Sequence, residues 1–62
     1  MEPQPTLVTA SLIAQIYDQV CYGNIPTPEN VESLSRVWER VRRHEPHRNY
    51  YDWQLAYIRA SL

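Results

Sequence analysis

Cys21, His44 and His47 are the side chains of this 62-residue chain that could supply a thiol nucleophile and an imidazole base. A thiol nucleophile needs a base and an orienting group within hydrogen-bond reach. Cys21 falls near the predicted end of a helix, where the negative end of the dipole disfavours a thiolate, and both histidines belong to another segment. So short a chain also leaves little room for a substrate pocket. We therefore expect no catalytic residues, no small-molecule substrate and a protein that is not an enzyme.

The segment His44-Glu45-Pro46-His47 places two imidazoles and a carboxylate in one turn, and Cys21 could supply a fourth metal ligand. Structural zinc sites usually carry paired Cys or His ligands at both ends of the motif. A single Cys stands at one end here, so the pattern predicts neither a metal site nor a cofactor. Because Cys21 is the only cysteine, no disulfide can form within one chain; we expect it to be a small buried side chain in a reducing compartment.

Basic residues are confined to the second half of the chain, and all of them are arginine. Residues 1–35 hold four acidic residues and no basic one, a net charge of −4, whereas residues 36–62 hold six arginines and three acidic residues, a net charge of +3. Such asymmetry indicates an anionic partner or self-association. The candidate contacts for nucleic acid or another anionic partner are Arg36, Arg40, Arg42, Arg43 and Arg48. The overall charge of −1 weighs against this alternative.

Prolines and a single glycine divide the chain into a flexible N-terminal arm, residues 1–8, and one helical domain, residues 9–62. Apolar residues at helical spacing predict helices over about 9–22, 28–44 and 50–62. Gly23 suits a left-handed cap after the first helix, Thr27 an N-cap before Pro28, and Asn49 an N-cap of the third helix. No segment alternates apolar and polar residues as a strand does. The predicted fold class is all-α, a small three-helix bundle.

One face of each predicted helix carries the apolar residues expected to form the core. They are Leu12, Ile13, Ile16, Tyr17 and Val20 in the first helix, Val31, Leu34, Val37, Trp38 and Val41 in the second, and Tyr51, Leu55, Ile58 and Leu62 in the third. A chain of this length buries only roughly 60% of its surface on folding. Oligomerisation commonly stabilises such small domains.

Aromatic residues with a polar group concentrate in the third predicted helix. The chain has five Tyr, two Trp and no Phe, and Tyr, Trp and Arg are enriched among the hot spots of protein interfaces. A core of this size cannot bury all of these rings, because each helix presents one stripe inward. Some must lie on the surface, where an aromatic cluster usually marks a binding site. The predicted partner-binding residues are Tyr50, Trp53, Tyr57 and Arg59.

These patterns predict a non-enzymatic protein–protein interaction module. We expect a small regulator, inhibitor or adaptor that docks on a larger protein through a Tyr, Trp and Arg face and self-associates as a homodimer. The alternative is a small nucleic-acid-binding regulator that uses segment 36–48. No run of about 18 apolar residues is present, so no membrane contact is expected. The first residues lack the basic start and apolar run of a signal peptide, which favours a cytoplasmic location.

Overall fold

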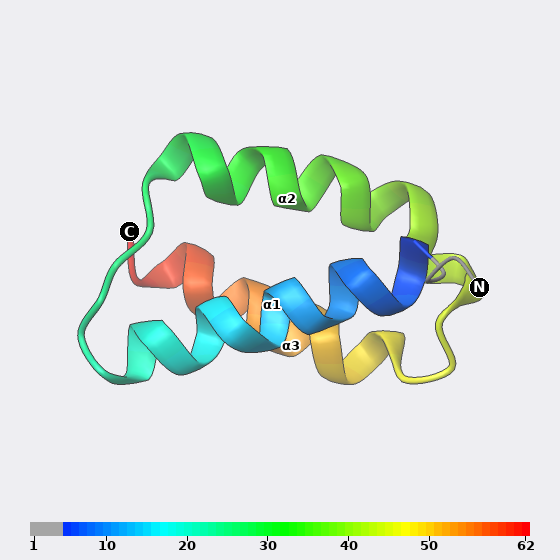
Figure 1. Ribbon diagram of the computed structural model, residues 1–62, viewed down its shortest axis with the longest axis horizontal. Helices are drawn as coiled ribbons and strands as arrows, with labels where there is room; N and C mark the ends of the chain where they lie inside the picture. The colour runs from blue at the N-terminus through cyan, green and yellow to red at the C-terminus, as the bar shows by residue number, and fades with distance from the viewer. Residues whose placement is uncertain (1–4) are drawn as a thin grey trace.

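The computed structural model describes residues 5–62, which form three α-helices and one short 3₁₀ helix. Helix α1 spans Pro5–Cys21, α2 spans Pro28–Val41, η1 spans Arg42–His44 and α3 spans Arg48–Ala60. The chain reverses direction at both connections, so α2 runs antiparallel to α1 and α3, and α1 packs against both other helices (Figure 1). No strand occurs within residues 5–62. The predicted all-α three-helix bundle is confirmed.

The connection between α1 and α2 has the caps that its sequence predicts. Gly23 has a φ of +90°, the left-handed conformation that closes a helix, and its N–H donates to the Val20 carbonyl at 2.9 Å. The Asn24 N–H donates to the Gln19 carbonyl at 2.8 Å, which completes the pattern of a Schellman cap. At the start of α2 the Thr27 hydroxyl accepts a hydrogen bond from the Asn30 N–H at 3.3 Å. The turn between these helices is therefore fixed by local sequence.

The starts of α1 and α3 and the end of α2 differ from the predicted bounds, and α1 and α3 end one and two residues earlier than predicted. Helix α1 begins at Pro5, so residues 5–8 are helical rather than part of an arm, because proline is tolerated in a first helical turn; residues 1–4 of the predicted arm lie outside the described residues. Helix α2 ends at Val41 and the chain continues as η1. The 3₁₀ helix ends before Glu45, which is extended (φ −101°, ψ 118°) because it precedes Pro46. Helix α3 begins at Arg48, its N-cap position is His47, and Asn49 is therefore not the cap.

The core is a single cluster between the three helices. Its buried residues are Ala10, Ile13, Val20, Val31, Leu34, Trp38, Leu55 and Ile58, and the half-buried Ile16, Tyr17, Val41 and Tyr51 pack against them. Three predicted core residues are exposed instead: Leu12, Val37 and Leu62. Val37 is displaced by about 100° on the helix from Trp38, whose indole fills the core at that level. Leu62 follows the end of α3, where helical spacing no longer sets its direction.

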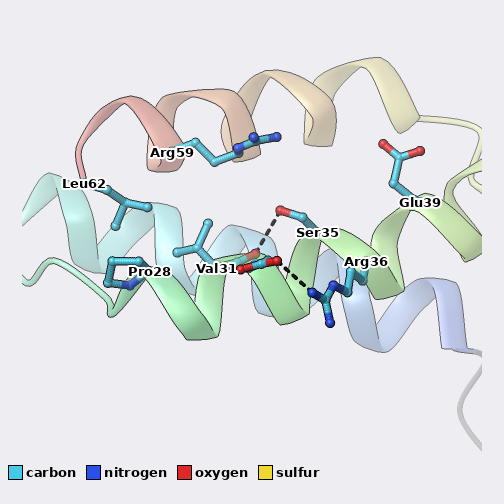
Figure 2. A pocket seen from close by; sticks show the side chains of 8 residues that line it. Pro28, Val31, Ser35, Arg36, Glu39, Arg59 and Leu62 are labelled. Atoms are coloured by element: carbon cyan, nitrogen blue, oxygen red, sulfur yellow. Dashed lines mark hydrogen bonds and ion pairs between the residues drawn. The ribbon is translucent and has the colours of Figure 1, made fainter.

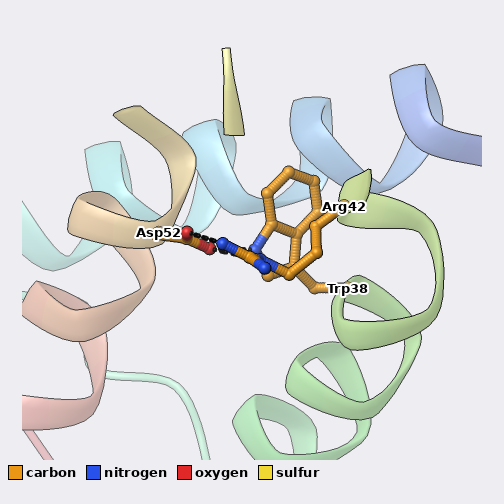
Figure 3. A network of polar contacts seen from close by, with 3 residues as sticks. All are labelled: Trp38, Arg42 and Asp52. Atoms are coloured by element: carbon orange, nitrogen blue, oxygen red, sulfur yellow. Dashed lines mark hydrogen bonds and ion pairs between the residues drawn. The ribbon is translucent and has the colours of Figure 1, made fainter. Parts of the chain in front are cut away.

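A polar network joins the end of α2 to the start of α3 (Figure 3). The Trp38 Nε1 donates to Asp52 Oδ1 at 2.6 Å, the Arg42 Nε donates to the same oxygen at 3.1 Å, and the Arg42 Nη2 donates to Oδ2. The Arg42 hydrogen bonds hold the pKa of the Asp52 carboxyl below its usual range; partial burial opposes this shift, and the Trp38 N–H adds to it. The network gives the buried indole N–H an acceptor and links two helices through side chains.

Replacing Asp52 with alanine is expected to destabilise the fold by about 1–3 kcal/mol, because it leaves the N–H of the buried Trp38 without an acceptor. Asp52→Asn retains an acceptor oxygen for Trp38 and loses only the ion pair with Arg42, so its loss is expected to be smaller. Urea denaturation followed by circular dichroism measures both. Equal losses in the two variants would show that the Trp38 hydrogen bond contributes nothing.

Acid is expected to remove the contribution of Asp52. Because its pKa is lowered in the folded state, the ion pair with Arg42 stabilises the fold above the unfolded-state pKa of about 3.9, and this stabilisation is lost as the pH falls through the lower folded-state value. The difference in melting temperature between wild type and Asp52→Asn is therefore expected to be largest near neutral pH and to shrink below about pH 4. A difference that does not change with pH would contradict this account of the pair.

Candidate functional site

Four aromatic rings from α1 and α3 form a continuous surface, here called the aromatic face: Tyr17, Tyr50, Trp53 and Tyr57. On α3, the ring centroids of Tyr50 and Trp53 are 6.4 Å apart and those of Trp53 and Tyr57 are 6.2 Å apart. Tyr17 lies across from them on α1, with its ring 5.5 Å from Trp53 and 5.2 Å from Tyr57. These separations are those of favourable aromatic pairs, so each ring restrains its neighbours.

The aromatic face is largely open to solvent. Tyr50 is 58% exposed, Trp53 55% and Tyr57 44%. Leu55 and Ile58 of the same helix are buried in the core. Since each residue turns the helix by about 100°, Trp53 lies roughly 200° from Leu55 and points away from the core. The three predicted aromatic site residues are therefore together and accessible.

Tyr17 is the member of the aromatic face that the sequence placed in the core. Its ring is half-buried, packs against the core cluster and also contacts the rings of Trp53 and Tyr57. Burial raises the pKa of the Tyr17 hydroxyl, and the neighbouring Cys21 side chain raises it further. Cys21 is exposed rather than buried, because it follows the last core position of α1. The Tyr17 hydroxyl is the one feature of the sequence that indicates a position at the edge of the core, because a tyrosine usually keeps its polar end near water.

Gln54 lies buried directly beside the aromatic face. It is 4% exposed, and its Nε2 donates to the Tyr50 hydroxyl at 3.4 Å. Its Oε1 is buried and has no hydrogen-bond partner within the described part of the chain. Burying this unpaired oxygen costs free energy of folding. The hydrogen bond from the Gln54 amide links the Tyr50 side chain to a buried position of α3.

Arg59 does not belong to the aromatic face. It follows Tyr57 by two residues, about 200° around the helix, and so points toward α2. There it lines a groove of about 410 Å³ between α2 and α3, together with Ser35, Glu39 and Leu62 (Figure 2). The aromatic face and Arg59 therefore occupy different sides of α3.

Two of the five arginines in segment 36–48 form ion pairs within the fold. Arg36 forms an ion pair with Glu32 at 2.7 Å, and Arg42 is bound to Asp52. The other three arginines of the segment, at positions 40, 43 and 48, are exposed and form no ion pair within residues 5–62. They lie where α2 ends and α3 begins, at one end of the bundle (Figure 1). The structure thus leaves three of the five predicted arginine contacts free to bind an anionic partner.

Among the residues considered for catalysis and metal binding, Cys21 is far from the two histidines in the fold. Cys21 ends α1, whereas His44 and His47 lie in the connection between α2 and α3, at the opposite end of the bundle (Figure 1). Over residues 5–62, no group of three or more His, Cys, Asp and Glu side chains is placed to hold a metal ion. None of the helices described is long and apolar enough to cross a membrane. The chain matches no protein-family model, no curated protein and no solved structure.

Proposed function

We propose that this protein is a non-enzymatic interaction module that docks on a larger protein through its aromatic face. The observation that carries the proposal is a set of four mutually packed rings, three of which are between 44% and 58% exposed. Exposed aromatic clusters of this kind usually mark protein-binding sites. A small regulator, inhibitor or adaptor is the class of protein that fits such a surface on so short a chain.

The aromatic face has the physical properties of an interface centre. Its rings restrain one another and are anchored on two packed helices, so docking would immobilise few additional side-chain rotamers. The three exposed rings, Tyr50, Trp53 and Tyr57, each carry a hydroxyl or an indole N–H, which can stay in water in the free protein and donate to a partner in the complex. Large apolar area combined with low entropic cost is the reason that Trp and Tyr dominate hot spots.

The proposed contact residues differ from the predicted ones in two ways: one residue is added and one is removed. Tyr17 joins Tyr50, Trp53 and Tyr57, because it lies against two of these rings. Arg59 leaves the set, because it lines the groove between α2 and α3. The proposed interface is therefore more apolar than predicted, and its affinity should depend little on salt.

Capture from a lysate of the source organism tests the proposal. Wild-type protein, Trp53→Ala and Tyr22→Ala are immobilised in parallel, each with and without nuclease treatment. Tyr22 is the matched control, because it is an exposed aromatic residue outside the aromatic face (78% exposed). A protein retained by wild type and by Tyr22→Ala but lost with Trp53→Ala is expected. Retention of the same proteins by all three would contradict the proposal.

The alternative is a nucleic-acid-binding regulator that uses the free arginines at positions 40, 43 and 48. Their exposure at one end of the bundle favours it, whereas the ion pairs of Arg36 and Arg42 reduce the available charge. Binding to phosphates would weaken steeply as salt is raised, because counterions are released on association. Capture that nuclease abolishes, and that a triple Arg→Ala variant at these positions abolishes as well, would favour this alternative over the aromatic face.

A further inference from the structure

A second apolar surface lies between α1 and α2 and shares no residue with the aromatic face. It is a groove of about 280 Å³ between α1 and α2, here called the α1–α2 groove. Its lining residues are Thr9, Leu12, Ile16, Asn30, Ser33, Leu34 and Val37. None of these side chains carries a charge, so covering the groove would cost no desolvation of an ion.

Aliphatic side chains extend the α1–α2 groove along α1. Val8, Leu12 and Ile16 follow one another at intervals of four residues, which places them in one row on the helix. Val8 is 43% exposed and Leu12 45%, and Val37 on the facing side of the groove is 48% exposed. Over its 17 residues α1 contains a single charged side chain, Asp18. The α1–α2 groove and the row on α1 that extends it therefore contain no charged side chain.

We propose that the α1–α2 groove is the contact between two copies of this chain, packed about a two-fold axis. A two-fold contact requires a surface that fits itself. Helix α1 meets this requirement, because its row of aliphatic side chains is a ridge and also one wall of the groove. Rows at four-residue spacing pack into the equivalent grooves of another helix. A domain with so small a core gains stability by burying such a face.

Charges at the two ends of α2 support a second copy as the occupant. Glu29 lies one turn before Ser33, and Arg40 lies one turn beyond Val37, so the two charges flank the lined part of the groove. They are eleven residues apart, about three helical turns, and therefore lie on the same side of α2. Both are exposed, and neither forms an ion pair within the described residues. An antiparallel two-fold arrangement brings Glu29 of each copy to Arg40 of the other.

The apolar part of the contact is tested with Leu12→Glu. Sedimentation equilibrium over micromolar to millimolar protein is expected to show a monomer–dimer equilibrium for wild type, and a dissociation constant at least about tenfold higher for Leu12→Glu, because a carboxylate is brought into an apolar contact. Ser11→Glu is the matched control, since it adds the same charge to the exposed neighbouring position outside the groove, and it should dimerise as wild type does. A wild-type protein that stays monomeric throughout would overturn the proposal.

Charge reversal tests the arrangement itself. Glu29→Arg and Arg40→Glu alone are each expected to weaken the dimer by roughly threefold to tenfold, because each places like charges together at both ends of the contact. The double variant should recover dimerisation, and an equimolar mixture of the two single variants should form a heterodimer. Two weakened single variants without recovery in the double variant or the mixture would overturn the two-fold pairing of these residues.

The same measurements separate this contact from the aromatic face. Trp53→Ala should leave the dimer intact, because Trp53 belongs to α3 and does not line the α1–α2 groove. A dimer that Trp53→Ala dissociates and Leu12→Glu does not would overturn the assignment of the groove. Loss of the dimer in Leu12→Glu, with capture of the larger partner retained, would support two separate interfaces.

Discussion

Trp38→Ala is expected to unfold the protein. Trp38 is 1% exposed and is the largest buried side chain, and truncation of a buried Trp to Ala commonly costs about 3–5 kcal/mol. At about 0.05–0.15 kcal/mol per residue, a 62-residue domain has a total stability of about 3–9 kcal/mol. The variant also removes the Nε1 hydrogen bond to Asp52. Circular dichroism at room temperature and a urea titration measure the loss of helix.

Trp38→Phe is the matched control for this result. It retains most of the apolar ring and removes the indole N–H, so it is expected to fold with reduced stability. The comparison separates core packing from the hydrogen bond to Asp52. A Trp38→Ala protein that is fully helical and melts close to wild type would show that this indole does not form the centre of the core.

Trp53→Ala, unlike Trp38→Ala, is expected to fold normally and to lose affinity for the partner. The side chain is 55% exposed and is not part of the core cluster, so the melting temperature should change little. Affinity for the captured partner should fall by at least about 30-fold, which corresponds to the hot-spot threshold of about 2 kcal/mol. Isothermal titration calorimetry with the purified partner measures the affinity, and thermal denaturation measures the fold.

Two further replacements are matched to Trp53→Ala. Tyr57→Ala removes the adjacent ring and should weaken binding by a smaller factor. Arg59→Ala changes the other side of α3 and should leave the affinity unchanged, because Arg59 lines the groove toward α2. An Arg59→Ala variant that binds more weakly than Tyr57→Ala would move the interface from the aromatic face to that groove.

The helices and their caps followed from the sequence because local interactions decide them. Gly23 supplies the left-handed cap, and Thr27 with Pro28 starts α2, irrespective of what packs around them. One Trp is buried and the other is exposed, which agrees with the expectation that so small a core cannot hold all of the aromatic rings. Such features depend on residues within one or two turns of each other.

The features that the sequence analysis did not predict depend on contacts between helices. Tyr17 joins the aromatic face only because α1 lies against α3, and no spacing within α1 indicates that contact. Arg42 was counted as a free arginine, because its pairing with Asp52 joins residues ten apart across the η1 turn. The sequence predicts Arg59 as a neighbour of Trp53 and Tyr57, whereas in the structure it lines the groove between α2 and α3. The direction of a side chain at the edge of an apolar stripe is set by neighbouring helices, which the sequence pattern does not contain.

The accessibility of Trp53 in the complex tests the account most directly. Protein labelled with 5-fluorotryptophan gives one fluorine resonance for Trp38 and one for Trp53, and a Trp53→Phe variant assigns them. In the free protein, a soluble paramagnetic agent should broaden the exposed Trp53 resonance and leave that of the buried Trp38 unchanged. Saturation with the captured partner should shift the Trp53 resonance and protect it from the agent. A complex in which Trp53 stays as accessible as in the free protein would contradict the assignment of the aromatic face as the binding surface.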